Sequence, residues 1–259
     1  MQSRASRRGI MRELFIGCAG WSLPSASRPL FGAGDSMLAR YATRFNAVEI
    51  NTSFYRPHRR ETYARWAASV PTGFRFSAKL PRTITHDARL RGVTRELDRF
   101  AGEVDGLGRK LALVLVQLPP SLAFEARPAA TFFAMLRRRF DAGIACEARH
   151  ASWFSPRVEA LWRRHRVARV AADPPVPSEA AHVPGGDPRW RYWRWHGSPR
   201  VYYSAYDEAR LRGFADALRN ARGRCWAIFD NTAHGHAVTD AAKLQAMLAA
   251  SPMRSRKPA

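Results

Sequence analysis

Short apolar runs alternate with longer amphipathic stretches along most of the chain. Eight runs have the length and the nearly continuous apolar character of parallel strands that are buried on both faces. These runs are Leu14–Cys18, Ala47–Asn51, Phe74–Lys79, Ala112–Gln117, Gly143–Glu147, Val167–Asp173, Tyr192–His196 and Cys225–Asn231. The repeated order of strand, helix and strand predicts a parallel sheet with helices packed against it.

Helical patterns separate most of these runs. Apolar residues at helical spacing, with Pro, Asp or Ser at several starts, predict the helices. They are Asp35–Phe45, Glu61–Ser69, Leu97–Leu107, Pro128–Phe140, Pro156–Arg164, Asp207–Ala221 and Thr239–Ala250. The stretch Pro174–Arg189 is rich in Pro and Gly, which predicts a long loop. Eight strands in 259 residues favour one α/β domain, a (β/α)8 TIM-like barrel that is irregular between strands six and seven.

One domain is expected over residues 13–250, because no long linker interrupts the pattern. Residues 1–12 and 251–259 are basic and polar, and we expect them to be loose tails. No apolar run reaches the length of a membrane span, and no apolar signal core follows the basic N-terminus. Cys18, Cys146 and Cys225 lie in apolar runs without a CxxC pair, which indicates buried, reduced thiols. We therefore expect a cytoplasmic protein with no membrane partner.

The net charge of +22 is the first indication of a polyanionic partner such as nucleic acid. The basic residues comprise 39 arginines and only 4 lysines, and they are spread along the whole chain. Many fall on predicted helix faces, as at residues 137–139 and 163–166. This distribution is more typical of solvated surface charge than of a nucleic-acid stripe.

Polar residues gather at the carboxyl ends of the predicted strands, where barrels of this type have their active sites. Seven of the eight runs end in such groups. They are Glu49, Asn51, Lys79, Gln117, Glu147, Arg149, His150, Asp173, Arg194, His196, Asp230 and Asn231. Side chains alternate along a strand, so Tyr192, Arg194 and His196 share one face while Trp193 and Trp195 share the other. We expect the first face to line a barrel mouth and the second to pack under helices.

The residue types at these strand ends suit acid–base chemistry on an anionic molecule. Glu147 and His196 are candidate proton-transfer groups, and Lys79 is suited to stabilise an oxyanion, hold a phosphate or form a Schiff base. Arg149 and Arg194 suit a carboxylate or phosphate on the ligand. Aromatic rings that would offer stacking surfaces follow in the sequence at Tyr55, Trp153 and Tyr206.

A purely structural reading of each residue stays open. A buried ion network without catalytic function would also account for Glu49, Lys79 and Arg194. His196 would then be a hydrogen-bonded core histidine, and Asp230 with Asn231 would cap a turn. A divalent metal is a minor alternative, since His234 and His236 lack a compact ligand spacing with His196, Glu147 or Asp173. No metal site, redox cofactor or nucleotide-binding motif is expected.

Several motifs occur together and in order. They are Ile16-Gly-Cys-Ala-Gly-Trp-Ser22, Val48-Glu-Ile-Asn-Thr-Ser-Phe-Tyr-Arg56, Phe76-Ser-Ala-Lys79 with Thr85-His86, Leu115-Val-Gln-Leu-Pro-Pro120, Cys146-Glu-Ala-Arg-His-Ala-Ser-Trp153, Arg194-Trp-His-Gly197 and Phe229-Asp-Asn-Thr-Ala233. In this respect the chain resembles the YecE-like family, domain of unknown function seventy-two, from about Phe15 to Leu248. The resemblance implies a TIM-barrel-type fold and no established reaction. It also implies a likeness to endonuclease IV-type barrels, which keeps nucleic acid as a candidate ligand.

Three functions follow from these observations, in descending order. The first is an enzyme of hydrolase, lyase or isomerase type, acting on a phosphate- or carboxylate-bearing small molecule. The second is a nucleic-acid-binding or nucleic-acid-processing barrel, and the third is a ligand-binding protein without catalysis. The sequence does not indicate an oligomeric state. Departures from the family pattern occur at Trp195, where a smaller apolar residue is usual, and at His234 and His236.

Overall fold

The strands and helices alternate along the chain as the pattern predicts, in a computed structural model that describes residues 13–250. The strands are β1 (Glu13–Cys18), β2 (Ala47–Ile50), β3 (Arg75–Lys79), β4 (Leu111–Gln117), β5 (Gly143–Glu147), β6 (Val167–Arg169), β7 (Ala171–Asp173), β8 (Gly185–Gly186), β9 (Trp190–Trp195) and β10 (Arg224–Phe229). The helices are α1 (Met37–Tyr41), α2 (Arg60–Ala68), α3 (Thr94–Val104), α4 (Ala126–Arg139), α5 (Pro156–His165), α6 (Glu208–Asn220) and α7 (His236–Ala250). The expected basic tails, 1–12 and 251–259, lie outside the described residues.

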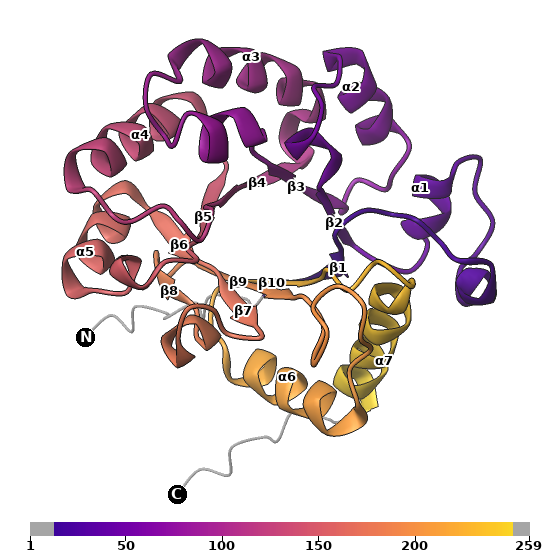
Figure 1. Cartoon of the computed structure of the whole chain (residues 1–259). Coiled ribbons are helices and arrows are strands. Elements are labelled where there is room, and N and C mark those ends of the chain that lie inside the picture. The colour runs from indigo at the N-terminus through magenta and orange to yellow at the C-terminus, as the bar shows by residue number, and fades with distance from the viewer. Residues whose placement is uncertain (1–12, 251–259) are drawn as a thin grey trace, which may run out of the picture.

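The strands pair into two sheets. One has the order β1-β10-β9-β7 and the other the order β2-β3-β4-β5-β6-β8. All pairings are parallel except that of β6 with the short β8. Figure 1 shows the strands around a common axis, with the helices outside them. The expectation of an α/β fold with parallel strands is confirmed, whereas the strand pairing does not form one closed eight-stranded sheet.

The sheets separate at two places. The predicted run Val167–Asp173 divides at Val170 into β6 and β7, which belong to different sheets. The other place is between β1 and β2, which are joined by one isolated bridge, Ala19 with Glu49, instead of a ladder.

Side chains complete the junction between β1 and β2. The Tyr41 hydroxyl accepts a hydrogen bond from the backbone N–H of Cys18 (2.8 Å) and donates one to the carbonyl of Ala47 (2.9 Å). Asn46 bonds the backbone of β1 through both its amide oxygen and its amide nitrogen, at 2.9 and 2.8 Å. The strands approach closely at Gly17, where an added Cβ would lie 1.9 Å from the Ala47 oxygen. Polar side chains therefore satisfy backbone groups that a strand ladder would otherwise pair.

Helix limits follow local hydrogen bonding. Helix α1 begins after Ser36, whose hydroxyl accepts from the N–H of Ala39, and it ends at Tyr41, well before the predicted end at Phe45. Just after the helix end, the Thr43 hydroxyl and the Thr43 backbone N–H both donate to the carbonyl of Arg40. Between Pro174 and Arg189 only a helical turn, Glu179–His182, and β8 occur, as the Pro and Gly content predicts. Within residues 13–250, no helix is both long and apolar enough to cross a membrane.

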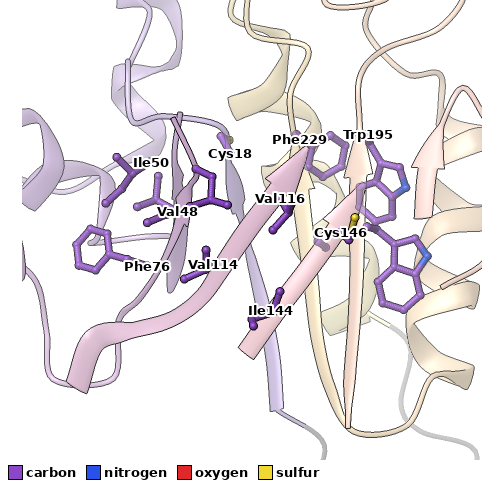
Figure 2. Packing of buried hydrophobic residues seen from close by; sticks show 14 of the residues in the cluster. Cys18, Val48, Ile50, Phe76, Val114, Val116, Ile144, Cys146, Trp195 and Phe229 are labelled. Atoms are coloured by element: carbon purple, nitrogen blue, oxygen red, sulfur yellow. The ribbon is translucent and has the colours of Figure 1, made fainter. Parts of the chain in front are cut away.

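Alternation along the strands separates two apolar layers. The outward side chains pack beneath the helices, where Figure 2 shows a set of them. This set includes Cys18, Val48, Ile50, Phe76, Val114, Val116, Ile144, Cys146, Trp195 and Phe229. A second layer lies on the opposite strand faces and includes Ala47, Leu113, Leu115, Ala145, Tyr192 and Trp226. All three cysteines are buried, as predicted, and within residues 13–250 none of them forms a disulfide.

Candidate functional site

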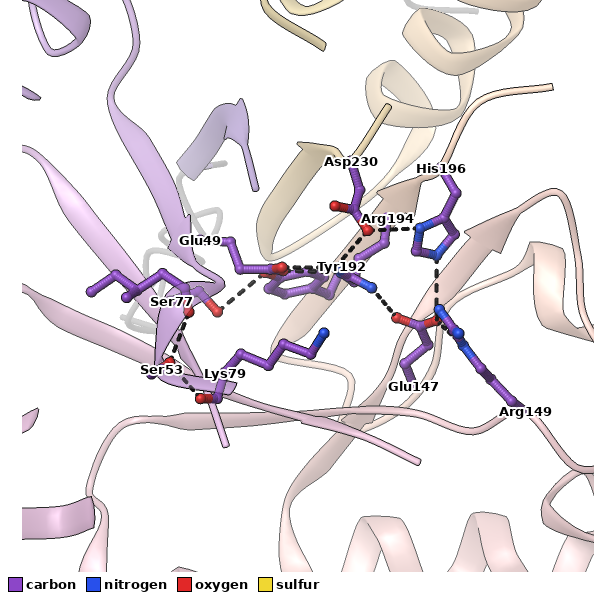
Figure 3. Close-up of polar contacts among 11 residues, drawn as sticks. Glu49, Ser53, Ser77, Lys79, Glu147, Arg149, Tyr192, Arg194, His196 and Asp230 are labelled. Atoms are coloured by element: carbon purple, nitrogen blue, oxygen red, sulfur yellow. Dashed lines mark hydrogen bonds and ion pairs between the residues drawn. The ribbon is translucent and has the colours of Figure 1, made fainter. Parts of the chain in front are cut away.

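The carboxyl ends of the strands bring a set of polar side chains together. Strand register makes Glu49 a neighbour of Ser77 and Gln117 a neighbour of Glu147. We call the connected set the buried network, and Figure 3 shows it. Its members are Glu49, Ser77, Glu147, Arg149, Tyr192, Arg194, His196 and Asp230.

Arg194 lies at the centre of the buried network and is fully inaccessible to solvent. Its Nη2 and Nε atoms donate to the two oxygens of Glu49, at 2.7 and 3.0 Å. Nη1 donates to Glu147 (2.5 Å) and Nη2 also donates to Asp230 (2.9 Å). Burial opposes the charge of Arg194, but the three carboxylates outweigh it and raise the pKa of the guanidinium. One cation therefore joins carboxylates from three different strand ends.

His196 completes the network between two acids. Its Nδ1 atom lies 2.9 Å from Asp230 Oδ2, and its Nε2 atom lies 3.3 Å from Glu147 Oε1. Burial lowers the pKa of His196, but Glu147 and Asp230 raise it further, so the net shift is upward. Burial likewise raises the pKa of Glu147, but Arg149 and Arg194 hold it well below its usual range. The imidazolium and a carboxylate are the favoured states of this pair.

Tyr192 supports Glu49 from the layer beneath. Its hydroxyl donates to Glu49 Oε2 (2.8 Å) and lies 3.1 Å from Ser77 Oγ. The ring is stacked on Trp226 at 5.8 Å between centroids. Tyr192 is two residues before Arg194 on β9, so the predicted common face is confirmed, although the hydrogen bond itself was not expected.

Lys79 differs from the other charged groups of the site. Only 4% of the residue is exposed, yet no residue in 13–250 accepts a hydrogen bond or pairs with its ammonium. The Nζ atom instead lies 4.1 Å from the centre of the Phe54 ring. Burial and the charge of Arg194 lower the pKa of Lys79 to about 8, against the opposing effect of Glu49 and Asp230. Its ammonium is thus the poorly compensated cation of the site.

A hollow of about 320 Å³, the central cavity, opens over the buried network. It is lined by Asn51, Phe54, Tyr55, Lys79, Arg82, His86, Gln117, Tyr202, Asp230 and Thr232. Asp230 belongs both to the network and to the lining of this cavity, and Lys79 lines the cavity without being bonded to the network. The pKa of His86 is lowered by burial and by the charges of Lys79 and Arg82, which favours the neutral imidazole. The cavity therefore holds a neutral base, a lysine, an arginine and a carboxylate.

A second hollow of about 800 Å³ adjoins the first, and we call it the side cavity. Both are lined by Asn51, Tyr55 and Thr232. Its other walls are largely apolar and include Trp21 and Met37. Tyr55 is 75% exposed at the shared rim. A ligand with a polar head and an apolar body would fit the two hollows together.

A third hollow, about 740 Å³ in volume, lies on the other face of β9. Trp193, Trp195 and Phe214 line it, and Trp195 stacks on Phe214 at 4.1 Å. The two tryptophans therefore face α6, as the alternation predicts. This groove is separate from the buried network, so we do not assign the strand-end chemistry to it.

Two predicted site residues lie elsewhere. Asp173 is in register with Trp195, so it faces α6 and pairs with Arg210 instead of the network. The expectation that Trp153 offers a stacking surface is also wrong, because it is 1% exposed. Its indole N–H donates to the carbonyl of Leu122 at 2.8 Å.

Three further residues have structural contacts. His150 accepts a hydrogen bond from the N–H of Ser152, which caps a short helical turn. Asn231 is fully buried, and its amide donates to Asp240 of α7. Tyr206 is 4% exposed and does not provide the open ring that was expected. His150 and Asn231 therefore support the surrounding loops and do not line the central cavity.

The last loop contains the two histidines that were considered as metal ligands. His234 and His236 lie 6.1 Å apart between ring centroids. Across residues 13–250, no group of three or more His, Cys, Asp or Glu side chains is placed to bind a metal ion.

Five cavity residues were not among the predicted site residues: Phe54, Arg82, His86, Tyr202 and Thr232. Arg82 and His86 lie in or beside the π-helical turn Thr83–Asp87 that follows β3. Their position directly after Lys79 was a usable signal, because loops after strand ends line such sites. Tyr202 comes from the loop after β9, where no periodic pattern indicates its direction.

Comparison with known proteins places the chain in a family. Curated relatives include UPF0759 protein YecE of Escherichia coli (strain K12), 32% identical over 143 residues, and UPF0759 protein YunF of Bacillus subtilis (strain 168), 28% identical over 149 residues. Each match covers 55% of this chain, and 50% and 53% of the relatives, so the aligned part spans about half of their length.

Solved structures of the same family share the fold. A DUF72 family protein from Enterococcus faecalis V583 has a TM-score of 0.75 and 21% identity, covering 96% of this chain and 100% of that one. Another DUF72 family protein, from Thermotoga maritima MSB8, has a TM-score of 0.73 and 22% identity, and the match covers 92% of this chain and 99% of that one. The family model described as "Protein of unknown function DUF72" matches residues 15–259. The chain therefore belongs to the DUF72 family.

Proposed function

We propose that the protein is an enzyme that acts on a small anionic molecule, bearing a phosphate or a carboxylate, by acid–base chemistry in the central cavity. The observation that carries the proposal is Lys79, a nearly buried ammonium without a hydrogen-bonded or ion-paired partner in residues 13–250. Burying an unpaired charge is costly, so such a group is rarely kept for packing alone. A ligand anion would supply the missing partner.

The scaffold supports this assignment. Strand ends from both sheets contribute to the buried network and to the central cavity, and we propose that the two sheets act together as a TIM-barrel-type framework (Figure 1). Enzymes built on such frameworks have their sites at these strand ends. Arg82 and Gln117 line the cavity beside Lys79 and would bind the ligand's anionic group.

The acid–base roles divide between the network and the cavity. Glu147 and His196 lie beneath the cavity as an ion pair, and Asp230 connects His196 to its wall. We propose that His196 is the group that exchanges protons with the ligand, and that it does so through Asp230. Glu147 would keep His196 in its charged form. Glu49, Arg149 and Arg194 then fix the geometry of these groups, and Asn51 and Tyr55 contact the ligand at the rim.

A ligand and turnover screen tests the proposal. Phosphate- and carboxylate-bearing metabolites are tested one by one for a rise in the unfolding temperature and for conversion, followed by mass spectrometry. A ligand present at 100 times its Kd should add about 2.7 kcal/mol of stability. The gain should disappear in Arg82→Gln and remain in Arg109→Gln, an exposed control before the amino end of β4.

The same screen separates the alternatives. Glu147→Gln and His196→Gln should keep the fold and lose conversion. Binding without any conversion would favour a ligand-binding protein without catalysis. If no anionic compound binds, or if Lys79→Met retains full conversion of an identified substrate, the proposed enzyme is wrong.

Nucleic acid is a second candidate, supported by one observation. Tyr55 is 75% exposed at the rim of a cavity that also contains Arg82, an arrangement suited to stacking a base beside a phosphate. Trp153 and Tyr206, expected to extend such a surface, are buried. Anisotropy of a single-stranded oligonucleotide tests the candidate: affinity should fall steeply with salt and by about 1–3 kcal/mol in Tyr55→Ala. Absence of binding at low salt would exclude it.

A further inference from the structure

We infer that Lys79 forms an imine with its substrate, which is therefore an aldehyde or a ketone that also carries a carboxylate or a phosphate. The inference rests on the proposed function, because it assigns the substrate class of the same cavity. It goes further in making Lys79 a nucleophile and not only a contact for charge.

The surroundings of Lys79 distinguish these two roles. The network already uses Arg194 and Arg149 to neutralise its carboxylates, each with hydrogen bonds of defined geometry. Lys79 takes no part in that pairing among residues 13–250, and its Nζ lies against the Phe54 ring at the cavity wall. A side chain that only balanced charge would be expected to bond the nearby carboxylates. The amine is instead left available to a molecule in the cavity.

The ionisation state of the amine agrees with this placement. Burial and the neighbouring guanidinium of Arg194 lower the pKa of Lys79 to about 8. At neutral pH roughly 300 times more of this side chain is in the neutral form than for an ordinary lysine. Only the neutral amine attacks a carbonyl carbon, and a nearby cation with a desolvated pocket is a known way to supply it.

The reaction balances without an oxidant or a reductant. The nitrogen lone pair of Lys79 forms an N–C bond to the carbonyl carbon, and the carbonyl oxygen takes up a proton. The resulting carbinolamine loses its hydroxyl as water while the nitrogen loses its second proton, which leaves a C=N bond. His86 lines the same cavity as Lys79 and has a lowered pKa, so its neutral imidazole would accept the proton from nitrogen. Asp230, hydrogen-bonded to His196, links the cavity to a proton donor.

The cavity also explains why the carbonyl compound would be anionic. Arg82 and Gln117 line the cavity with Lys79, and its volume of about 320 Å³ suits a small molecule. A carboxylate or phosphate near Arg82 would place the carbonyl group toward Lys79. A neutral carbonyl compound of the same size would lack this orientation.

Reductive trapping tests the inference. The full chain is incubated with sodium cyanoborohydride in four parallel reactions. Each reaction also contains one carbonyl compound: glyoxylate, pyruvate, dihydroxyacetone phosphate or neutral propanal. Peptide mapping is simple because the chain has only four lysines: Lys79, Lys110, Lys243 and Lys257. We expect at least one anionic carbonyl compound to label Lys79 more than about tenfold over each other lysine, with a rate that rises as the amine deprotonates toward pH 8.

Matched variants assign the labelled atom. Lys79→Arg should remove the label, whereas Lys110→Arg should keep it, since the Lys110 ammonium is bound to the carbonyls of Ala67 and Val70. Arg82→Gln should reduce the preference for anionic over neutral compounds. Site mapping on the unmodified chain keeps the test valid even if a Lys79 variant does not fold.

The outcomes separate the imine from the proposed enzyme. Equal labelling of all lysines, or no labelling of Lys79 by any of the four compounds, would overturn the imine. If anionic compounds nevertheless stabilise the protein through Arg82, the proposed site stands and Lys79 only binds charge. If they neither stabilise the protein nor label it, both proposals fail.

Discussion

Arg194 on β9 binds both carboxylate oxygens of Glu49 on β2, at 2.7 and 3.0 Å. The two strands belong to different sheets, which meet at β1 and β2 through one isolated bridge. The same guanidinium reaches Glu147 on β5. This residue therefore fastens the two sheets together at the carboxyl end, directly beneath the central cavity.

Substitution of Arg194 should be strongly destabilising. Arg194→Met leaves the buried carboxylates of Glu49, Glu147 and Asp230 without their shared cation, which should cost about 3–5 kcal/mol. Urea unfolding measures the loss. The exposed pair of Arg60 with Asp105 gives the control, because Arg60→Met should cost less than about 1 kcal/mol. Equal losses in the two variants would mean that the network does not stabilise the fold.

The junction between β1 and β2 should depend on one hydroxyl. Tyr41→Phe keeps the ring but leaves the Cys18 N–H and the Ala47 carbonyl without their partner, at a cost of about 2 kcal/mol. The exposed Tyr203→Phe should change the free energy of unfolding by less than about 0.5 kcal/mol. Hydrogen exchange at Cys18 should rise in the first variant only. Unchanged exchange would show that the junction is satisfied in another way.

The sequence predicts the strand content of the fold well, because each run is nearly continuous in apolar residues. It does not predict the separation into two sheets. At that separation Tyr41 and Asn46 bond the backbone across the junction of β1 and β2, and the strand is interrupted at Val170, between β6 and β7. The bonds of Tyr41 to Cys18 and of Asn46 to Ile16 join residues 23 and 30 positions apart, and no periodic pattern indicates them.

The candidate site was predictable where strand geometry determines direction. Alternation places Arg194 and His196 on one face, and both join the network. Asp173 fails the same reasoning, because its register with Trp195 turns it toward α6. Register between distant strands depends on the folded pairing. The sequence alone therefore identified the strand ends without showing which of their side chains face the cavity.

Titration should identify His196 as the histidine with a raised pKa. Its partners Glu147 and Asp230 outweigh burial, so it should titrate above 6.5, whereas His86 should titrate below that value. His196 then contributes stability that is fully present below pH 6.5 and is lost as the pH rises through its folded-state pKa. Proton NMR of the imidazole signals as a function of pH gives the measurement. The variants His196→Gln and His86→Gln identify which signal belongs to which histidine. If the signal lost in His196→Gln titrates below 6.5, the ion-pair description is wrong.

Lys79 should lower the stability of the protein at neutral pH. Its pKa falls from 10.5 to about 8 in the folded state, so the unfolded chain binds more protons between these values and stability rises with pH across that window. Below pH 8 the full free-energy cost of burying the charged ammonium is present. Lys79→Met should therefore stabilise the fold by about 3 kcal/mol at pH 7. Denaturant unfolding at pH 7 and pH 9.5 should show this gain shrinking.

The exposed Lys243→Met on α7 is the matched control, with a change below about 0.5 kcal/mol at both pH values. A loss of stability in Lys79→Met at pH 7 would mean that the ammonium serves the nearby carboxylates as a structural partner. A gain would mean that the fold tolerates a destabilising lysine at the cavity wall, as expected when a residue is retained for chemistry and not for packing.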